Sequence, residues 1–264
     1  MGVLNVTPDS FYDGGRHRTL KGALKHAEAM IREGADWIDV GGESTRPGSR
    51  PVSESEEIGR TLPVVRALRR KFPKTPVSID TQKSAVALAA LDAGASMVND
   101  VSALERDPRM VDTVLKREPF VVLMHMRGEP STMQSLARYR DVVGEVQAYL
   151  AGRVRSLVRQ GFPRSKIVVD PGLGFGKTAE HNLRIMGGLK RFLSLGCPVL
   201  VGASRKSFIG RVLSKNGVPL PPEERLEGSL AAAVWAALQG ASILRVHDVG
   251  ATRKALEVLK AVRA

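Results

Sequence analysis

Cysteine is almost absent from this sequence, with Cys197 alone among 264 residues. A single thiol cannot form a disulfide within the chain, and it cannot supply a zinc site built on several thiolates. Cys197 stands next to Pro198 at the start of an apolar run, where a small buried side chain is the expected role. The sequence therefore excludes disulfide-stabilised secreted domains and cysteine-rich zinc modules.

Long apolar segments are missing as well. No run approaches the roughly 20 residues that a membrane-spanning helix needs. The first residues, MGVLNVTPDSF, lack the basic stretch and long apolar segment of a signal peptide. We therefore expect no membrane partner and a cytoplasmic location.

Aromatic residues are scarce, at 5% of the chain, and the net charge of +13 is scattered without any block of five basic residues. Nucleic-acid binding usually needs aromatic stacking platforms or a clustered basic stripe. The sequence therefore predicts no nucleic-acid partner. The net positive charge is compatible with an acidic partner.

What the sequence does contain is a series of short, β-rich apolar runs. Their interiors are nearly continuous in Val, Ile and Leu, as expected for parallel strands covered on both faces. Helical periodicity lies between most of them, for example over residues 20–31 and 53–72. The eight runs are 2–6, 36–40, 76–80, 96–100, 120–124, 166–170, 198–202 and 242–246.

Eight strand–helix units in a chain of this length predict an α/β fold, the (β/α)8 TIM barrel, as one domain over residues 1–264. A doubly wound open sheet is the alternative. That fold should carry a glycine-rich turn directly after its first strand. Here the first strand is followed by Thr7-Pro8-Asp9-Ser10, so the barrel is favoured.

Polar side chains follow every one of these runs, at the end where catalytic groups of a barrel lie. A single Asp or Ser there is most often a helix cap. Capping cannot explain Arg205 and Lys206, because a helix N-terminus repels cations. One group is rich in acceptors and suits the N–H edge of a flat heterocycle: Asp39, Asp80, Asn99 and Asp170. The other is cationic and suits phosphate or carboxylate: Arg46, Arg205, Lys206, Arg245 and His247.

Two further motifs do not support a separate function. GFGKT (174–178) resembles the end of a phosphate-binding loop, but Pro171 stands where that motif needs glycine, so we interpret it as a barrel loop. His125 and His247 lack a third ligand at helical spacing, which makes a zinc site a weak interpretation.

Taken together, the strand-end segments resemble those of the dihydropteroate synthases, from residue 2 to about 249. The segments are LNVTPDSFYDGG (4–15), IDVGGESTRPGS (38–49), SIDT (78–81), ND (99–100), DPGLGFGKT (170–178), SRKSFIG (204–210) and RVHDV (245–249). The resemblance implies a TIM barrel of folate biosynthesis. Such enzymes join 6-hydroxymethyl-7,8-dihydropterin pyrophosphate to p-aminobenzoate, giving 7,8-dihydropteroate and pyrophosphate.

The resemblance also implies roles for matching residues. The pterin edge is expected at Asp80, Asn99 and Asp170, with Lys206 donating to the ring carbonyl and a ring nitrogen. Arg245 is expected to stack on the ring and to hold pyrophosphate with His247. The residues expected in catalysis are Asp80, Lys206, Arg245 and His247. Asp39 and Arg205, from the two groups above, complete the predicted substrate contacts.

The remaining roles concern the leaving group and the second substrate. Asn5 is expected to contact Mg²⁺, the implied cofactor, and Arg46 to reach the pyrophosphate. The p-aminobenzoate pocket, where sulfonamides would compete, is expected at Thr45, Pro47, Phe175 and Ser207. The family resemblance also suggests a homodimer. The alternative is a methyltetrahydrofolate-dependent corrinoid methyltransferase, which shares a pterin pocket but has no pyrophosphate to hold, so SRKSFIG and RVHDV argue against it.

Overall fold

The computed structural model describes residues 1–6, 16–44, 51–129 and 132–263. Three residues predicted for the site, Thr45, Arg46 and Pro47, lie outside these ranges. Parallel strands alternate with helices along the described chain. The strands are β1 (Gly2–Asn5), β2 (Ile38–Gly41), β3 (Val77–Asp80), β4 (Met97–Asp100), β5 (Phe120–Met124), β6 (Ile167–Asp170), β7 (Leu200–Val201) and β8 (Ile243–Leu244).

The strands form a TIM barrel, as the sequence predicts. β1 to β6 pair in chain order as one parallel sheet, and β7 pairs with β8. Single parallel bridges join the two groups: Val169 of β6 to Val199, and Gly2 of β1 to Val246. Backbone hydrogen bonds accompany both bridges, including Val3 N–H to the Val246 carbonyl at 3.0 Å. These bridges close the ring of strands.

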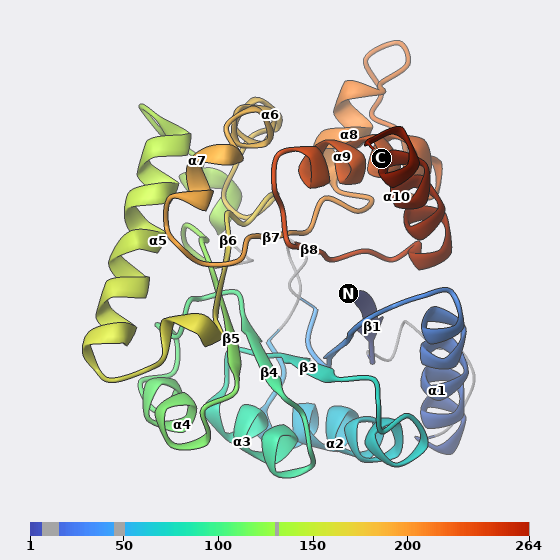
Figure 1. Cartoon of the computed structure of the whole chain (residues 1–264), viewed down its shortest axis with the longest axis vertical. Coiled ribbons are helices and arrows are strands. Elements are labelled where there is room, and N and C mark those ends of the chain that lie inside the picture. The colour runs from blue at the N-terminus through green and yellow to red at the C-terminus, as the bar shows by residue number, and fades with distance from the viewer. Residues whose placement is uncertain (7–15, 45–50, 130–131, 264) are drawn as a thin grey trace.

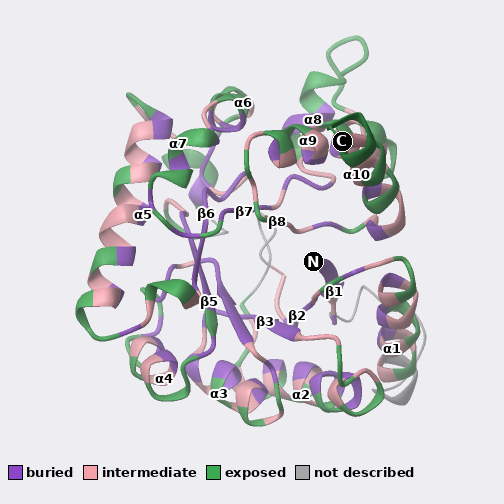
Figure 2. Cartoon of the chain, viewed as in Figure 1, coloured by how far each residue is buried: buried purple, intermediate pink, exposed green. Residues whose placement is uncertain are grey.

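The helices surround the strands, and their outward faces carry most of the exposed residues (Figures 1 and 2). No helix of the described residues is long and apolar enough to cross a membrane. The α-helices are α1 (Arg16–Arg32), α2 (Glu54–Lys71), α3 (Ser84–Asp92), α4 (Met110–Arg117), α5 (Val142–Arg159), α6 (Ala179–Gly187), α7 (Lys190–Leu193), α8 (Ser207–Val212), α9 (Leu226–Leu238) and α10 (Val249–Arg263). Short 3₁₀ segments are η2 (Met133–Leu136), η3 (Arg164–Lys166) and η4 (Pro222–Glu224).

Helix ends follow the local signals of the sequence. Ser53 caps α2, because its hydroxyl accepts from the Glu56 backbone N–H at 3.2 Å. The Glu56 carboxylate binds Arg60 instead of returning to the Ser53 backbone N–H, so only half of a capping box forms. Gly34 and Gly94 follow α1 and α3 with φ of +97° and +98°, the left-handed conformation that glycine adopts without strain.

Strand alternation places the polar site residues. Ile38, Val40, Ile79, Val98 and Val169 belong to the large core between the strands and helices. A second apolar cluster joins Met1, just before β1, to Met97, Val122, Val168 and Leu200 of four strands and fills the inside of the barrel. Side chains alternate along a strand, so a residue next to one that points outward to the helices points inward to the barrel. Asp39, Asp80, Asn99 and Asp170 therefore lie on the inner face, above the second cluster.

Candidate active site

The centre of the site is a buried group of charges around Arg245, which follows β8. Its Nε donates to Asp39 Oδ2 at 2.6 Å, and its Nη2 donates to Asp80 Oδ2 at 2.7 Å. Asn99 Nδ2 donates to the same Asp39 oxygen at 3.1 Å. Asp39 Oδ1 is buried without a hydrogen-bond partner among the described residues. Asp39, Asp80 and Asn99, which the sequence predicts as acceptors on separate strands, therefore lie together at the Arg245 guanidinium.

Burial and charge oppose each other in this group. Burial raises the pKa of Asp80 to about 7, and Asp39 adds to the rise while Arg245 opposes it. Burial lowers the pKa of Arg245, but the carboxylates of Asp39 and Asp80 outweigh it, so this pKa is raised overall. A carboxyl group that titrates near neutrality can accept a ring N–H or carry a proton at working pH.

Asp170 and Lys206 form the second part of the site. Asp170 ends β6, is 6% exposed, and accepts from the Gly172 backbone N–H at 2.7 Å. Burial raises its pKa, with Lys206 opposing. Burial lowers the pKa of Lys206 to about 8, against the attraction of Asp170. Lys206 therefore stays mostly protonated at neutral pH while remaining sensitive to its surroundings.

The loop after β6 brings Phe175 to the same place. Lys206 Nζ lies 4.5 Å from the centre of the Phe175 ring and donates to the Leu173 carbonyl. Gly172, Gly174 and Gly176 all have positive φ, at +67°, +83° and +61°. A Cβ on Gly172 would lie 2.0 Å from the His125 carbonyl oxygen. Both the positive φ and the lack of space therefore require glycine at this position. The glycine pattern lets the loop fold tightly over Asp170.

The polar residues predicted after β7 and β8 differ in their surroundings: His247 and Ser207 are exposed, whereas Arg205 is paired with a carboxylate. His247 is exposed, and its backbone N–H donates to the buried Ser204 hydroxyl at 3.2 Å. Arg205 makes two hydrogen bonds to Asp248, at 2.8 and 2.6 Å, so its charge is already paired. Ser207 is exposed at the start of α8, directly after Lys206. Substrate contacts by Arg205, Ser207 and His247 stay predictions.

A magnesium site is predicted at Asn5, the last residue of β1. An ideal Cβ on Gly41 would lie 3.6 Å from Asp80 Oδ2 and 3.7 Å from Asn5 Oδ1, so both oxygens flank the same glycine. The described residues contain no group of three His, Cys, Asp or Glu side chains able to hold a metal. Mg²⁺ commonly takes one or two protein oxygens and completes its shell with water and phosphate. The donors present fit an ion of that kind.

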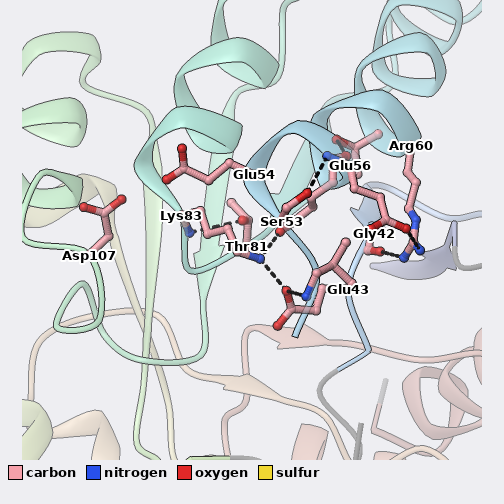
Figure 3. A network of polar contacts seen from close by, with 12 residues as sticks. Gly42, Glu43, Ser53, Glu54, Glu56, Arg60, Thr81, Lys83 and Asp107 are labelled. Carbon is pink, nitrogen blue, oxygen red and sulfur yellow. Dashed lines mark hydrogen bonds and ion pairs between the residues drawn. The ribbon is translucent and has the colours of Figure 1, made fainter. Parts of the chain in front are cut away.

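A second charged network, not predicted from the sequence, lies beside Asp80. Lys83 Nζ donates to the carboxylates of Glu43 and Glu57, and Glu43 Oε2 accepts from the Val52 N–H at 3.1 Å (Figure 3). Arg60 Nη1 donates to the Gly42 carbonyl at 2.8 Å. Glu43 therefore ties Gly42–Ser44, after β2, to the segment that enters α2. No motif spacing signals this network, because its members come from three elements.

Lys177 is a further buried residue that the sequence does not predict for the site, because GFGKT (174–178) is interpreted only as a barrel loop. It is 3% exposed, and its Nζ lies 2.9 Å from the Gly172 carbonyl, the Phe175 carbonyl and His125 Nδ1. His125 is also buried and, through the burial of its ring, has a lowered pKa. Lys177 of the GFGKT segment and His125, which the sequence pairs with His247 as a weak zinc site, therefore lie in contact with each other.

Comparison with known proteins agrees with this geometry. The family model described as "Pterin binding enzyme" matches residues 1–247. The chain belongs to this family of pterin-binding enzymes. The dihydropteroate synthase of Escherichia coli strain K12 is 46% identical over 261 residues, covering 99% of this chain and 90% of that protein. Within the family, the chain thus groups with the dihydropteroate synthases.

Solved structures give the same result. Xanthomonas albilineans dihydropteroate synthase with 4-aminobenzoic acid superposes with a TM-score of 0.93 at 45% identity, covering 100% of this chain and 92% of that chain. The same enzyme in complex with 7,8-dihydropteroate gives 0.89 at 43% identity, covering 100% and 93%. These similarities support the TIM barrel and the family together.

Proposed function

We propose that this protein condenses 6-hydroxymethyl-7,8-dihydropterin pyrophosphate with p-aminobenzoate, giving 7,8-dihydropteroate and pyrophosphate. The observation that carries the proposal is the inward-facing set of Asp39, Asp80, Asn99 and Asp170 around Arg245, beside Lys206. This set offers acceptors for the ring N–H groups and a cation for the ring carbonyl. Family membership and the relatives' names support the same reaction.

The reaction breaks the bond between the pterin methylene carbon and the pyrophosphate oxygen. The oxygen leaves with the electron pair, and the arylamine nitrogen then bonds to the carbon. We propose that departure precedes attack, because the electron-rich ring and a nearby carboxylate stabilise positive charge on the methylene. An arylamine is mostly unprotonated at neutral pH, so no strong general base is required, and its extra proton passes to solvent after attack.

Binding of the two ends of the pterin substrate divides between the buried and exposed groups. The buried carboxylates and Lys206 are proposed to hold the ring. His247 is exposed and Arg245 keeps partial exposure, so both can meet the pyrophosphate. Mg²⁺, with Asn5 as the proposed protein ligand, would neutralise charge on the leaving group. Thr45, Arg46, Pro47, Phe175 and Ser207 are proposed from the family resemblance to complete the sites.

The direct test is product formation by the purified protein. With pterin pyrophosphate, p-aminobenzoate and Mg²⁺, we expect pyrophosphate and dihydropteroate in equal amounts, with both products measured. Removal of Mg²⁺ with a chelator should reduce turnover. Tight pterin binding without turnover, accompanied by methyl transfer from methyltetrahydrofolate to a corrinoid, would contradict the proposal.

A homodimer and a cytoplasmic location complete the proposal, and both are carried over from the sequence analysis. Light scattering across a concentration series tests the first. Fractionation of cells that produce the protein tests the second.

A further inference from the structure

The loop after β6 is held by its carbonyls. From Gly172 to Gly176, five consecutive backbone carbonyls each accept a hydrogen bond from a side chain, two of them from Lys177, which directly follows this stretch. Lys177 donates to those of Gly172 and Phe175, each at 2.9 Å. Lys206 donates to Leu173, Gln134 to Gly174 at 3.1 Å, and Tyr139 to Gly176 at 3.0 Å. Irregular backbone needs such partners, and here they specify one loop shape.

Lys177 contributes most to this arrangement, since it holds two of the five carbonyls. Its Nζ also lies 3.2 Å from the His125 carbonyl and 2.9 Å from His125 Nδ1. An ammonium group donates three hydrogen bonds and accepts none, and every neighbour here can accept. All four neighbours are uncharged. Lys177 therefore acts on backbone shape rather than through an ion pair.

Burial of this amine is costly, which argues for a specific role. Burial lowers the pKa of Lys177 well below its ordinary value. The Asp170 carboxylate opposes that shift, while the cations Lys206 and Arg127 add to it. A methionine of similar length would fill the same space without the desolvation cost. The donors are what a lysine adds.

Three groups of the proposed substrate site, Asp170, Lys206 and Phe175, depend on the same loop. The Gly172 N–H binds Asp170, the Leu173 carbonyl receives Lys206, and the Phe175 ring lies against the Lys206 ammonium. Gly172 packs directly on the carbonyl of His125, to which Lys177 is also bound. A shift of this loop would therefore move Asp170, Lys206 and Phe175 relative to one another.

We propose that Lys177 is a positioning residue for pterin binding. It joins the loops after β5 and β6 through His125 and the Gly172 and Phe175 carbonyls, and so fixes Asp170, Phe175 and Lys206 relative to one another. It does not touch the substrate. This inference rests on the proposed function, because it concerns the affinity of that same site for the ring.

The test measures the dissociation constant for 6-hydroxymethylpterin, a ligand without phosphates, by calorimetry. Lys177→Met keeps the length and removes all donors. Lys177→Gln keeps an amide N–H pair and should retain part of the effect. We expect affinity to fall about tenfold or more in Lys177→Met and by an intermediate factor in Lys177→Gln.

Lys166→Met is the matched control at the opposite end of β6. Lys166 also donates to a backbone carbonyl, that of Glu118 at 2.7 Å, but it is partly exposed and far along the strand from Asp170. Its removal should leave pterin affinity and turnover unchanged. Circular dichroism and the melting temperature report separately whether each variant is folded.

The outcomes separate clearly. Folded Lys177 variants with the wild-type dissociation constant would overturn the inference, and Lys177→Gln decides the matter should Lys177→Met not fold. Equal losses in Lys177→Met and Lys166→Met would also overturn it, because they would indicate general destabilisation. Failure of the wild-type protein to form dihydropteroate would instead contradict the proposed function.

Discussion

Two basic side chains in this barrel are held in opposite ways. Arg245, after β8, lies between the carboxylates of Asp39 and Asp80, and its pKa is raised because these carboxylates outweigh its burial. Lys177, after β6, meets only carbonyls and an imidazole, and its burial lowers its pKa. Burial acts in the same direction on both, so the charge of the partners decides the result.

The difference separates two tasks within one site. The positive charge of Arg245 is balanced by the carboxylates of Asp39 and Asp80, and each of these side chains can exchange one hydrogen bond for a contact to a substrate atom. Around Lys177, a donor fixes backbone whose glycines would otherwise allow many shapes. Substitutions around Arg245 should therefore respond strongly to pH, whereas those in the β6 loop should act mainly on affinity.

The largest effect is expected for Arg245→Met. Breaking a buried ion pair by removing one partner costs about 3–5 kcal/mol, because the remaining charges stay buried. Asp80, whose pKa burial raises to about 7, can escape this cost by taking up a proton, so the loss of unfolding free energy should be larger at pH 8 than at pH 5. Chemical denaturation at both values measures it. Arg205→Met, which breaks a partly exposed pair with Asp248, should cost about 1 kcal/mol or less.

Lys206→Ala should reduce kcat/KM by about 100-fold or more, the scale seen when a preorganised donor is removed from an active site. The fold should persist, because Lys206 is only partly buried and Asp170 keeps its hydrogen bond from the Gly172 N–H. Steady-state kinetics with pterin pyrophosphate as the varied substrate give the value, and the melting temperature gives the control. A loss below fivefold in a folded variant would refute a ring-binding role for this lysine.

The pH dependence of pterin affinity should follow Lys206. Burial lowers its pKa to about 8, so the ammonium loses its proton as the pH rises through that value. Between pH 8 and pH 9, where Asp80 with its pKa of about 7 is already largely ionised, affinity for 6-hydroxymethylpterin should fall about fivefold. In Lys206→Arg the cation persists, and the alkaline loss should disappear even if affinity is lower throughout. An unchanged alkaline loss in that variant would assign it to another group.

The smallest effect is expected for Tyr139→Phe, at a residue that lies before α5 and donates to the β6 loop. It removes the hydroxyl that donates to the Gly176 carbonyl at 3.0 Å and keeps the ring that contacts His125, His181 and Arg127. One hydrogen bond contributes about 0.5–1.5 kcal/mol, so pterin affinity should fall by a few-fold at most. A loss of pterin affinity equal to that of Lys177→Met would contradict this expectation, because Tyr139 donates to one carbonyl of the loop and Lys177 donates to two.

The sequence predicted the barrel and most of its polar centre because both depend on local pattern. Apolar runs mark the strands, and alternation along them decides that Asp39, Asp80, Asn99 and Asp170 point inward. The pairing of Arg205 with Asp248 was not predictable, since it joins residues 43 positions apart by side-chain direction alone. The role of Lys177 is not predictable from the sequence, because its partners are mostly backbone carbonyls. Every residue has a backbone carbonyl, so the identity of the partner residues gives no signal.

The most direct test of the two-ended site compares two ligands on two variants by titration calorimetry: 6-hydroxymethylpterin and its pyrophosphate ester, with Lys206→Ala and His247→Ala. Lys206→Ala should weaken both ligands by the same factor, because it removes a contact to the ring that they share. His247→Ala should weaken only the pyrophosphate ester. A Lys206→Ala variant that binds the plain pterin as wild type does, and loses only the ester, would contradict the account.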